Sequence, residues 1–225
     1  MRDIIVHAND PVTLVGGAPT DAETLSLALS LAPRLVAADS GAAAALAEGH
    51  IPEAVIGDMD SLSETHLALL PQERVHRIAE QDSTDFDKCL ASIRAPLIVG
   101  LGFTGARLDH QMAAFNSLVR HPRQRCILIG AQEIILLAPP ALRLDLDKGA
   151  VLSLFPMGAV EGTSEGLEWP LRGLNFAPDG QVGTSNRVTG PVWLAFTAPK
   201  MLLILPRSVL GQLVERMLAR PYGWG

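Results

Sequence analysis

Short apolar runs alternate with amphipathic segments along the first 140 residues. Six runs have the length and composition of strands, at residues 12–15, 34–38, 54–56, 74–78, 97–99 and 126–129. Five segments between them have helical patterns, at residues 22–31, 42–48, 64–70, 85–93 and 108–120. This alternation predicts a Rossmann-like α/β/α domain, with a parallel sheet covered on both faces, over residues 1–140. Ligands of such sheets bind at the carboxyl ends of the strands.

The pattern changes after Pro139-Pro140. Eight glycines between Gly149 and Gly190 separate short apolar segments, which lie at residues 142–146, 151–156, 167–171, 191–196 and 201–205. Regularly spaced turn signals between short strands predict an antiparallel β-sandwich over residues 141–225. The last apolar pattern, over residues 208–220, predicts a helix that begins with Ser208 as its N-cap.

Composition narrows the class of protein. The chain of 225 residues has a formal net charge of −6, and the acidic excess lies in residues 1–140. This excess argues against a nucleic-acid-binding surface. No stretch free of Asp, Glu, Lys and Arg exceeds 12 residues, which is too short for a membrane span, and the first residues do not resemble a signal peptide. Cys89 and Cys126 stand in apolar segments and are expected to be buried thiols. We therefore expect a cytoplasmic protein.

Aspartates follow the ends of four predicted strands. They are Asp39, Asp58, Asp60, Asp82, Asp85, Asp87 and Asp109. In a parallel sheet these positions meet on one rim, where like charges repel unless a cation joins them. Mg²⁺ prefers oxygen ligands together with substrate phosphates, so the pattern predicts a magnesium–phosphate site. Any single Asp could instead cap a helix or close an Asx-turn, and Asp85 or Ser83-Thr84 could cap the helix that follows.

Cationic side chains and glycines accompany these acids. Lys88 lies within the Asp-rich segment, although an exposed helix charge is the alternative, and Arg107 could bind a phosphate bidentately. Gly16-Gly17 and the glycines of residues 100–105 allow a ligand to approach the backbone closely. A Walker A sequence is absent, and the G-x-G-x-x-G match lacks the acidic residue that a dinucleotide site needs. His110 could be a general base or a structural residue.

Seven segments together resemble the motifs of thiamine pyrophosphokinases, in the same order. Five of them match the motifs of the catalytic domain and lie at residues 38–42, 49–52, 56–61, 81–88 and 105–110. Two more, at residues 166–171 and 184–186, resemble segments that contact thiamine. The likeness spans most of residues 12–205, and the ordered set is more specific than any one segment.

The resemblance implies an enzyme that transfers diphosphate from ATP to the hydroxyethyl group of thiamine, giving thiamine diphosphate and AMP. It also implies a homodimer with its active site at the subunit interface, an ATP- and Mg²⁺-binding domain over residues 1–140, and a thiamine-binding domain over residues 141–225. The residues that it places on Mg²⁺ and the ATP phosphates are Asp58, Asp60 and Asp85. Those that it places in the nucleotide pocket are Asp39, Gln81, Thr84, Lys88, Arg107 and Asp109. Those that it places on thiamine are Trp169, Ser185 and Asn186.

The expected chemistry is consistent with these residue types. Thiamine carries a cationic thiazolium ring, which the face of Trp169 attracts by about 0.5–2 kcal/mol, although Trp169 could also pack in a core. Attack of a hydroxyl on phosphorus needs in-line positioning and charge neutralisation more than a strong base, and Asp60 or Asp109 could accept the proton. Three features depart from the family pattern: Ala106, Ala198-Pro199 and the helix after residue 207.

Two other functions use parts of the same pattern. A Mg²⁺-dependent phosphohydrolase would use the acidic rim, but it leaves Trp169 and Ser185-Asn186 without a role. A non-catalytic nucleotide- or thiamine-binding module would bind without turnover, but it does not need both Asp58 and Asp60.

Overall fold

The computed structural model describes residues 3–219 and 223–224. It divides into two compact units, the first of residues 1–117 and 128–131 and the second of residues 118–127 and 132–225. Residues 132–140, which the predicted boundary assigns to the first domain, belong to the second unit. The mixed α/β class is confirmed. Among the described helices, none is both long and apolar enough to cross a membrane.

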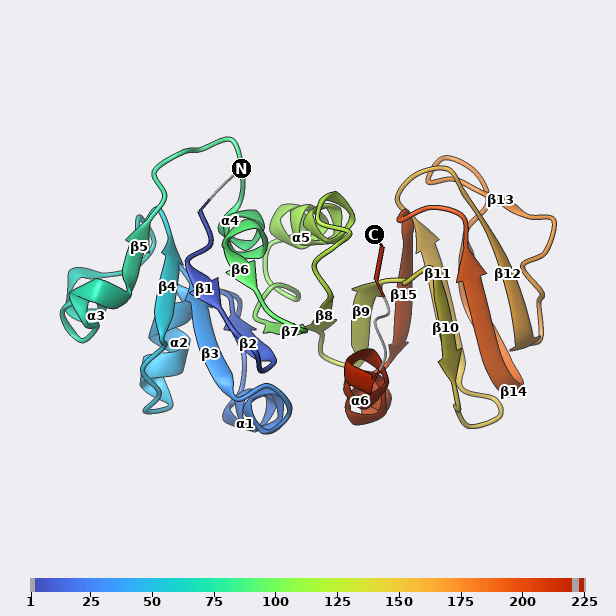
Figure 1. Ribbon diagram of the computed structural model, residues 1–225, viewed down its shortest axis with the longest axis horizontal. Coiled ribbons are helices and arrows are strands. Elements are labelled where there is room, and N and C mark those ends of the chain that lie inside the picture. Colours follow the sequence, from blue (N-terminus) through green and yellow to red (C-terminus); the bar gives the residue numbers. More distant parts are fainter. Residues whose placement is uncertain (1–2, 220–222, 225) are drawn as a thin grey trace. The chain divides into compact units, whose positions relative to one another are not determined.

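Every strand pair within the first unit is parallel among the described pairings. These pairs are β2 with β7, β3 with β4, β4 with β5, and the short β1 with β6 (Figure 1). The strands are β1 (Val6–His7), β2 (Val12–Val15), β3 (Arg34–Ala38), β4 (Ala54–Gly57), β5 (Val75–Arg77), β6 (Ile93–Arg94) and β7 (Ile98–Leu101). The helices are α1 (Ala22–Leu31), α2 (Gly41–Ala47), α3 (Glu64–Ala68), α4 (Asp85–Ser92) and most of α5 (Leu108–Arg120). A 3₁₀ turn spans Gln72–Arg74.

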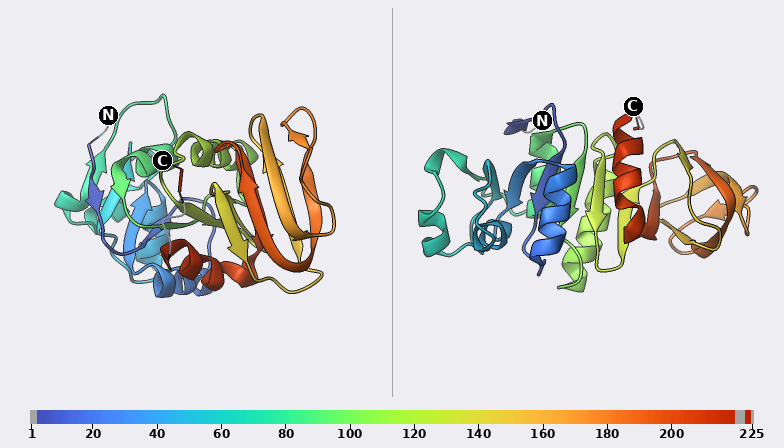
Figure 2. Two further views of the ribbon diagram at one scale, coloured as in Figure 1. Left: turned by 45° about the vertical axis from the view of Figure 1, so that its right-hand side comes forward. Right: turned by 90° about the horizontal axis from the view of Figure 1, so that it is seen from below.

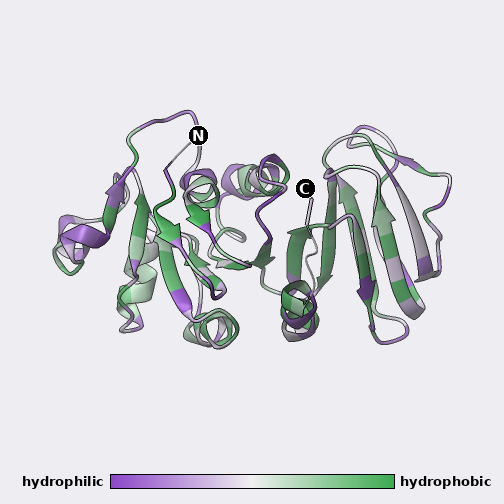
Figure 3. Ribbon diagram, viewed as in Figure 1, coloured by the Kyte–Doolittle hydropathy of each residue, from purple (hydrophilic) through white to green (hydrophobic). Residues whose placement is uncertain are grey.

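The local sequence explains where these elements begin. The side chains of Asp21, Ser63 and Thr84 accept hydrogen bonds from backbone N–H groups in the first turns of α1, α3 and α4. Such caps satisfy donors that a helix leaves unpaired at its N-terminus. All residues of β2, β4 and β7 are buried, as expected for parallel strands covered on both faces, and Figure 3 shows these strands as mostly hydrophobic.

The described strand pairs of the second unit are all antiparallel, and the isolated bridge from Phe176 to Gln181 is parallel. The strands of this unit are β9 (Glu133–Leu137), β10 (Ala141–Leu144), β11 (Val151–Pro156), β12 (Val160–Leu167), β13 (Asn175–Phe176), β14 (Gly183–Phe196) and β15 (Met201–Pro206). β8 (Cys126–Ile129) contains residues of both units. Neighbouring strands pair in the order β9-β15-β11-β14, and β14 also pairs with β10 and β12. Figure 2 shows these strands from two further directions.

The long strand β14 belongs to two sets of pairs. Its first residues pair with β11, from Gly183 to Arg187. Its later residues pair with β12, from Val188 to Phe196, and with β10, from Val192 to Ala195. A strand that changes partners along its length joins two sheets at a corner. The pairing therefore forms two faces from one continuous segment of chain.

Several predicted elements differ from the structure. Of the expected strand over residues 167–171, only Leu167 is in a strand, because Gly166 (φ 74°) lies at a bulge and Pro170 has no N–H to donate. Ser208 does not cap the last helix, because residues Arg207–Val209 form a 3₁₀ turn before α6 (Leu210–Ala219). Arg220, the expected last residue of that helix, lies outside the described residues.

The sequence also missed strands. β9, β12 and the first half of β14 were not predicted, and the last two are rich in Gly, Ser and Thr, which resemble turns. Neighbouring strands on both sides supply the hydrogen bonds that keep these weakly hydrophobic segments extended. Residue propensity alone does not contain this information.

The helix α6 packs into the second unit through one apolar face. Its buried residues are Leu210, Leu213, Val214 and Met217. Arg125 donates a hydrogen bond to the Met217 carbonyl at the end of the helix, at 2.6 Å. This helix is therefore part of the core of its unit rather than an appended tail.

We expect Leu213→Ala to reduce the free energy of unfolding by about 2–5 kcal/mol, because it empties a fully buried site. Leu218→Ala, on the 40% exposed side of the same helix, is the matched control and should change it by less than about 0.5 kcal/mol. Urea unfolding followed by circular dichroism measures both. Equal effects would show that α6 contributes only its helical propensity.

Candidate active site

The parallel register of β3 and β4 brings two aspartates together. Ala38 pairs with Ile56, so Asp39 and Asp58, which follow the two strand ends, lie on the same edge. Gly57 makes this approach possible. A Cβ at Gly57 would lie 2.9 Å from Asp39 Cβ and 3.1 Å from Asp85 Oδ1. A side chain at this position would therefore push apart the carboxylates of the site.

Asp39 is buried at this edge with one oxygen unpaired. It is 3% exposed, and its φ of 42° is in the left-handed region, which Asp tolerates better than most residues. Its Oδ2 accepts a hydrogen bond from Ser61 N at 3.3 Å, whereas Oδ1 has no partner. Burial, and then the negative charge of Asp85, raise the pKa of this carboxyl. A buried, unpaired carboxylate oxygen is costly unless something binds to it.

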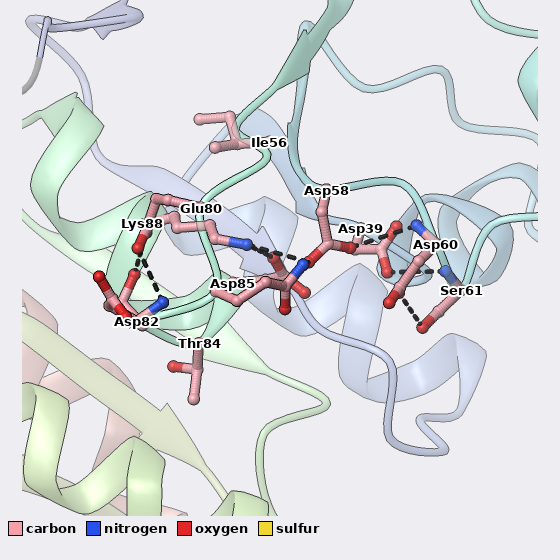
Figure 4. Close-up of polar contacts among 12 residues, drawn as sticks. Asp39, Ile56, Asp58, Asp60, Ser61, Glu80, Asp82, Thr84, Asp85 and Lys88 are labelled. Atoms are coloured by element: carbon pink, nitrogen blue, oxygen red, sulfur yellow. Dashed lines mark hydrogen bonds and ion pairs between the residues drawn. The ribbon is translucent and has the colours of Figure 1, made fainter.

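Lys88 joins the two neighbouring carboxylates. Its ammonium donates to Asp85 Oδ1 at 2.9 Å and to Asp58 Oδ2 at 3.1 Å, and the residue is only 1% exposed (Figure 4). Burial alone would lower the pKa of Lys88, but the hydrogen bonds to Asp85 and Asp58 outweigh it and raise the pKa. Burial alone would likewise raise the pKa of Asp58, but Lys88 and the N–H of Asp60 lower it. Lys88 is therefore not the exposed helix charge that was the alternative.

Three carboxylates are grouped closely enough to share a cation. One ligand oxygen from each of Asp39, Asp58 and Asp60 can be chosen so that all lie within 4.8 Å of one another. All three donors are carboxylate oxygens. The carboxylate of buried Asp39 has one oxygen, Oδ1, without a hydrogen-bond partner. This donor set fits a hard cation such as Mg²⁺. Asp85 lies outside the group and against Lys88, so its assignment as a metal ligand stays a prediction.

The predicted pocket residues Gln81 and Thr84, together with Ser61, which was not predicted, hold these groups in place. Gln81 Nε2 donates to Asp58 Oδ2 at 3.2 Å, and Ser61 Oγ donates to Asp60 Oδ1 at 2.8 Å. The sequence left Asp85 and Ser83-Thr84 as alternative caps of the helix. In the structure Thr84 caps α4, and Asp85 lies in the first turn. Asp85 is consequently free to face Lys88 rather than the helix end.

Arg107 and Asp109 form an exposed pair. Arg107 Nη2 and Nε donate to the two oxygens of Asp109 at 2.6 and 3.1 Å, and the side chains are 68% and 64% exposed. The hydrogen bond from Arg107 lowers the pKa of Asp109 to about 2. This carboxylate is therefore a weak proton acceptor at neutral pH. The pair orients the guanidinium next to the cavity.

Apart from Asp109, which holds Arg107 from outside, these side chains line one cavity of about 530 Å³ in the first unit. Glycines, carboxylates and cations form its polar part, and His110 also lines it. The sequence missed Phe103, which lines the cavity and packs on Phe86 with ring centroids 4.4 Å apart. Phe103 follows Gly102, whose φ of 74° requires glycine. An aromatic wall beside a polar pocket suits a ligand that has both a planar ring and phosphates.

The glycines predicted to approach a ligand have two different roles. Gly17 and Gly102 line the cavity. Gly16 does not line it, and a Cβ at Gly16 would lie 2.5 Å from the carbonyl oxygen of Gly102. Gly16 therefore allows two backbone segments to pack against each other.

In the second unit, Trp169 is 53% exposed, so the alternative of a core tryptophan is wrong. Ser185 is also exposed and has a left-handed φ of 60°. Asn186 is 4% exposed, and its amide is bonded to the backbone of Trp169. The three predicted thiamine residues thus lie close together, but they differ in how accessible their side chains are.

An α/β unit with carboxylates at the ends of its parallel strands, and with Lys88 and Arg107 beside them, is typical of the class of proteins that bind nucleotide phosphates together with a hard cation. Comparison with known proteins identifies the family within this class. Residues 25–129 match the model of the thiamin pyrophosphokinase catalytic domain, and residues 141–201 match that of its vitamin B1 binding domain. The chain belongs to the thiamin pyrophosphokinase family.

Individual relatives agree with this assignment. Thiamine pyrophosphokinase 1 of Arabidopsis thaliana is 30% identical over 165 residues, which are 65% of this chain and 62% of the plant protein. Thiamine pyrophosphokinase of Bacillus subtilis is 28% identical over 92% of this chain and 99% of its own length. The solved thiamin pyrophosphokinase of yeast has a TM-score of 0.72 at 17% identity and covers 96% of this chain and 94% of its own. The match thus spans less than two thirds of the plant relative, and the yeast structure shows the shared fold.

We expect Asp39→Asn to raise the melting temperature at pH 7. In a protein of this size, each kcal/mol gained in the free energy of unfolding raises the melting temperature by roughly 2–4 °C. The pKa of buried Asp39 is raised, so its ionisation costs the folded state stability as pH rises through that pKa, and Asn removes this cost. Below the ordinary value of 3.8, where both states are protonated, the difference should disappear. Thermal melts between pH 3 and pH 8 measure it.

With Mg²⁺ present, the wild type should have a higher melting temperature than Asp39→Asn, the reverse of the order without it. A cation that binds the folded state stabilises the wild type, and Asp39→Asn should gain less because one ligand oxygen is lost. The exposed substitution Asp179→Asn is the control and should gain as much as the wild type. An equal gain in Asp39→Asn would remove Asp39 from the cation site.

Proposed function

We propose that this protein is a thiamine diphosphokinase, which transfers diphosphate from ATP to thiamine and releases AMP. The observation that carries the proposal is the cavity of the first unit, where Asp39, Asp58, Asp60, Asp85 and Lys88 gather inside the segment matched by the catalytic-domain model. The exposed Trp169 lies in the segment matched by the vitamin B1 binding model. A phosphohydrolase or a binding module needs only one of these two features.

The proposal includes several finer assignments. The first compact unit is the ATP- and Mg²⁺-binding domain, and the second compact unit is a thiamine-binding β-sandwich. The protein acts in the cytoplasm as a homodimer with the active site at the subunit interface. These assignments rest on the family resemblance, and sedimentation of the purified protein measures the oligomeric state.

Mg²⁺, when bound, would neutralise phosphate oxygens, and Asp39, Asp58 and Asp60 are the residues that would hold it. Lys88 keeps Asp58 in its ionised form and fixes its position. Arg107 stands beside the cavity with its guanidinium oriented by Asp109, and a phosphate can bind it bidentately. These groups position the phosphate chain of ATP for in-line attack.

The reaction forms one bond and breaks one. The hydroxyl oxygen of thiamine attacks the β-phosphorus, and the bond from that phosphorus to the oxygen that bridges it to the α-phosphorus breaks. AMP leaves with the bridging oxygen and its electron pair. The hydroxyl proton passes to a base, and Asp60 is a better candidate than Asp109, whose pKa of about 2 leaves it a weak acceptor.

Incubation with ATP, Mg²⁺ and thiamine should give AMP and thiamine diphosphate in equal amounts, measured by chromatography. ADP with thiamine monophosphate would contradict diphosphate transfer. Release of phosphate from ATP without thiamine would favour the phosphohydrolase. Saturable thiamine binding without any product would favour the binding module.

Asp58→Asn should lower kcat by at least about 100-fold, because it removes a charged ligand oxygen and one partner of Lys88. Circular dichroism checks that the fold is retained. Asp147→Asn, at an exposed position of the second unit, is the matched control and should keep the wild-type rate. Wild-type turnover in Asp58→Asn would exclude Asp58 from the reaction.

A further inference from the structure

The exposed Trp169 is held by a polar side chain rather than by its own strand pairing. β12 ends at Leu167, whose partner on β14 is Val188. Continued by two residues, this antiparallel register places Trp169 opposite Asn186. Glu168 N still donates to the carbonyl of Arg187 at 2.9 Å. The chain at Trp169 thus follows β14 beyond the end of the strand.

Asn186 cannot continue the ladder with its own backbone. In the register of β14, Asn186 pairs with Leu152 on β11, the strand on the other side. Its side chain instead bonds both backbone groups of Trp169. Nδ2 donates to the Trp169 carbonyl at 2.7 Å, and Oδ1 accepts from Trp169 N at 3.1 Å. The amide therefore replaces one residue of a strand, with one donor and one acceptor.

The hydrogen-bonding capacity of Asn186 is largely used inside the protein. Oδ1 also accepts from Arg187 N at 2.8 Å, and the residue is 4% exposed. The preceding residue, Ser185, has a φ of 60°, and its N–H donates to Ser153 Oγ at 2.9 Å. These contacts fix the chain on both sides of Asn186. Little of the amide is left to meet a ligand.

We propose that Asn186 is a positioning residue for Trp169 and not a direct contact of thiamine. By clamping both backbone groups of Trp169, it fixes the direction in which the exposed indole leaves the main chain before the cationic ring arrives. A cation–π contact depends on the position of the ring face, so a preoriented indole loses less conformational entropy on binding. The inference rests on the proposed function only through the identity of the ligand.

A double-mutant cycle with Trp169→Ala and Asn186→Ala tests this role. Asn186→Ala alone should raise the KM for thiamine about 10-fold, while kcat and the KM for ATP stay within about twofold. In the Trp169→Ala background, Asn186→Ala should raise the KM by less than about twofold, because its effect passes through the indole. Fully additive effects would mean that Asn186 contacts thiamine itself and would overturn the proposal.

Two further variants complete the cycle. Asn186→Asp keeps the acceptor for Trp169 N and Arg187 N but loses the Nδ2 donor, so its KM should lie between those of the wild type and Asn186→Ala. Asn175→Ala removes an exposed asparagine of β13 and should match the wild type. A kcat loss in Asn186→Ala at unchanged thiamine KM would assign Asn186 to chemistry or to folding and contradict positioning.

A readout without ATP or turnover separates this inference from the proposed function. The chain has three tryptophans, so a ¹H–¹⁵N spectrum has three indole N–H signals, and Trp169→Phe identifies one of them. Asn186→Ala, or Asn186→Asp if the Ala variant does not fold, should shift or broaden this signal and leave the other two in place. An unchanged Trp169 signal would overturn the proposal, even if the wild type makes thiamine diphosphate. Failure of the wild type to form product would overturn the proposed function. The spectrum would still decide whether Asn186 positions Trp169.

Discussion

The candidate site depends on one buried ammonium group. Lys88 is 1% exposed and is shared by Asp58 and Asp85, at 3.1 and 2.9 Å. Removing a charge from water costs several kcal/mol unless partners compensate for it. Here two carboxylates compensate one ammonium, and the ammonium in turn allows two like charges to stand close together. Without Lys88, Asp58 would ionise less readily and would be a poorer ligand for a cation.

The backbone around this ion pair is adapted to the same arrangement. β3 and β4 bring Asp39 beside the pair, and only glycine fits at position 57 between the carboxylates. Asp39 and Met59 both have left-handed φ angles, at 42° and 65°. Such conformations cost of order 1 kcal/mol for residues other than glycine, and they occur where the surrounding fold enforces them. The fold therefore spends stability to hold several carboxylates at one edge.

The sequence predicted the elements that carry the acids but not how the acids are paired. The bounds of β2, β3, α1 and α5 agree with the predictions, because long apolar periods and capping residues define them locally. Local sequence carries no sign that Lys88 is buried, since burial depends on packing between α4 and strands far away in the chain. Local sequence likewise carries no sign of the hydrogen bonds from Asn186 to Trp169, because they depend on the register of β12 and β14. The ordered motifs singled out both residues, whereas the contacts of each side chain required the tertiary structure.

Charge balance connects the pocket to its proposed substrate. Asp39, Asp58, Asp60 and Asp85 stand against the single ammonium of Lys88, and the guanidinium of Arg107 is already paired with Asp109. The phosphates of ATP are strongly negative, so such a surface would repel the nucleotide alone. A divalent cation bound with ATP reverses this sign, and the same carboxylates then attract the complex. The acidity of the pocket thus favours a nucleotide that arrives with its cation, and it disfavours free anions of similar size.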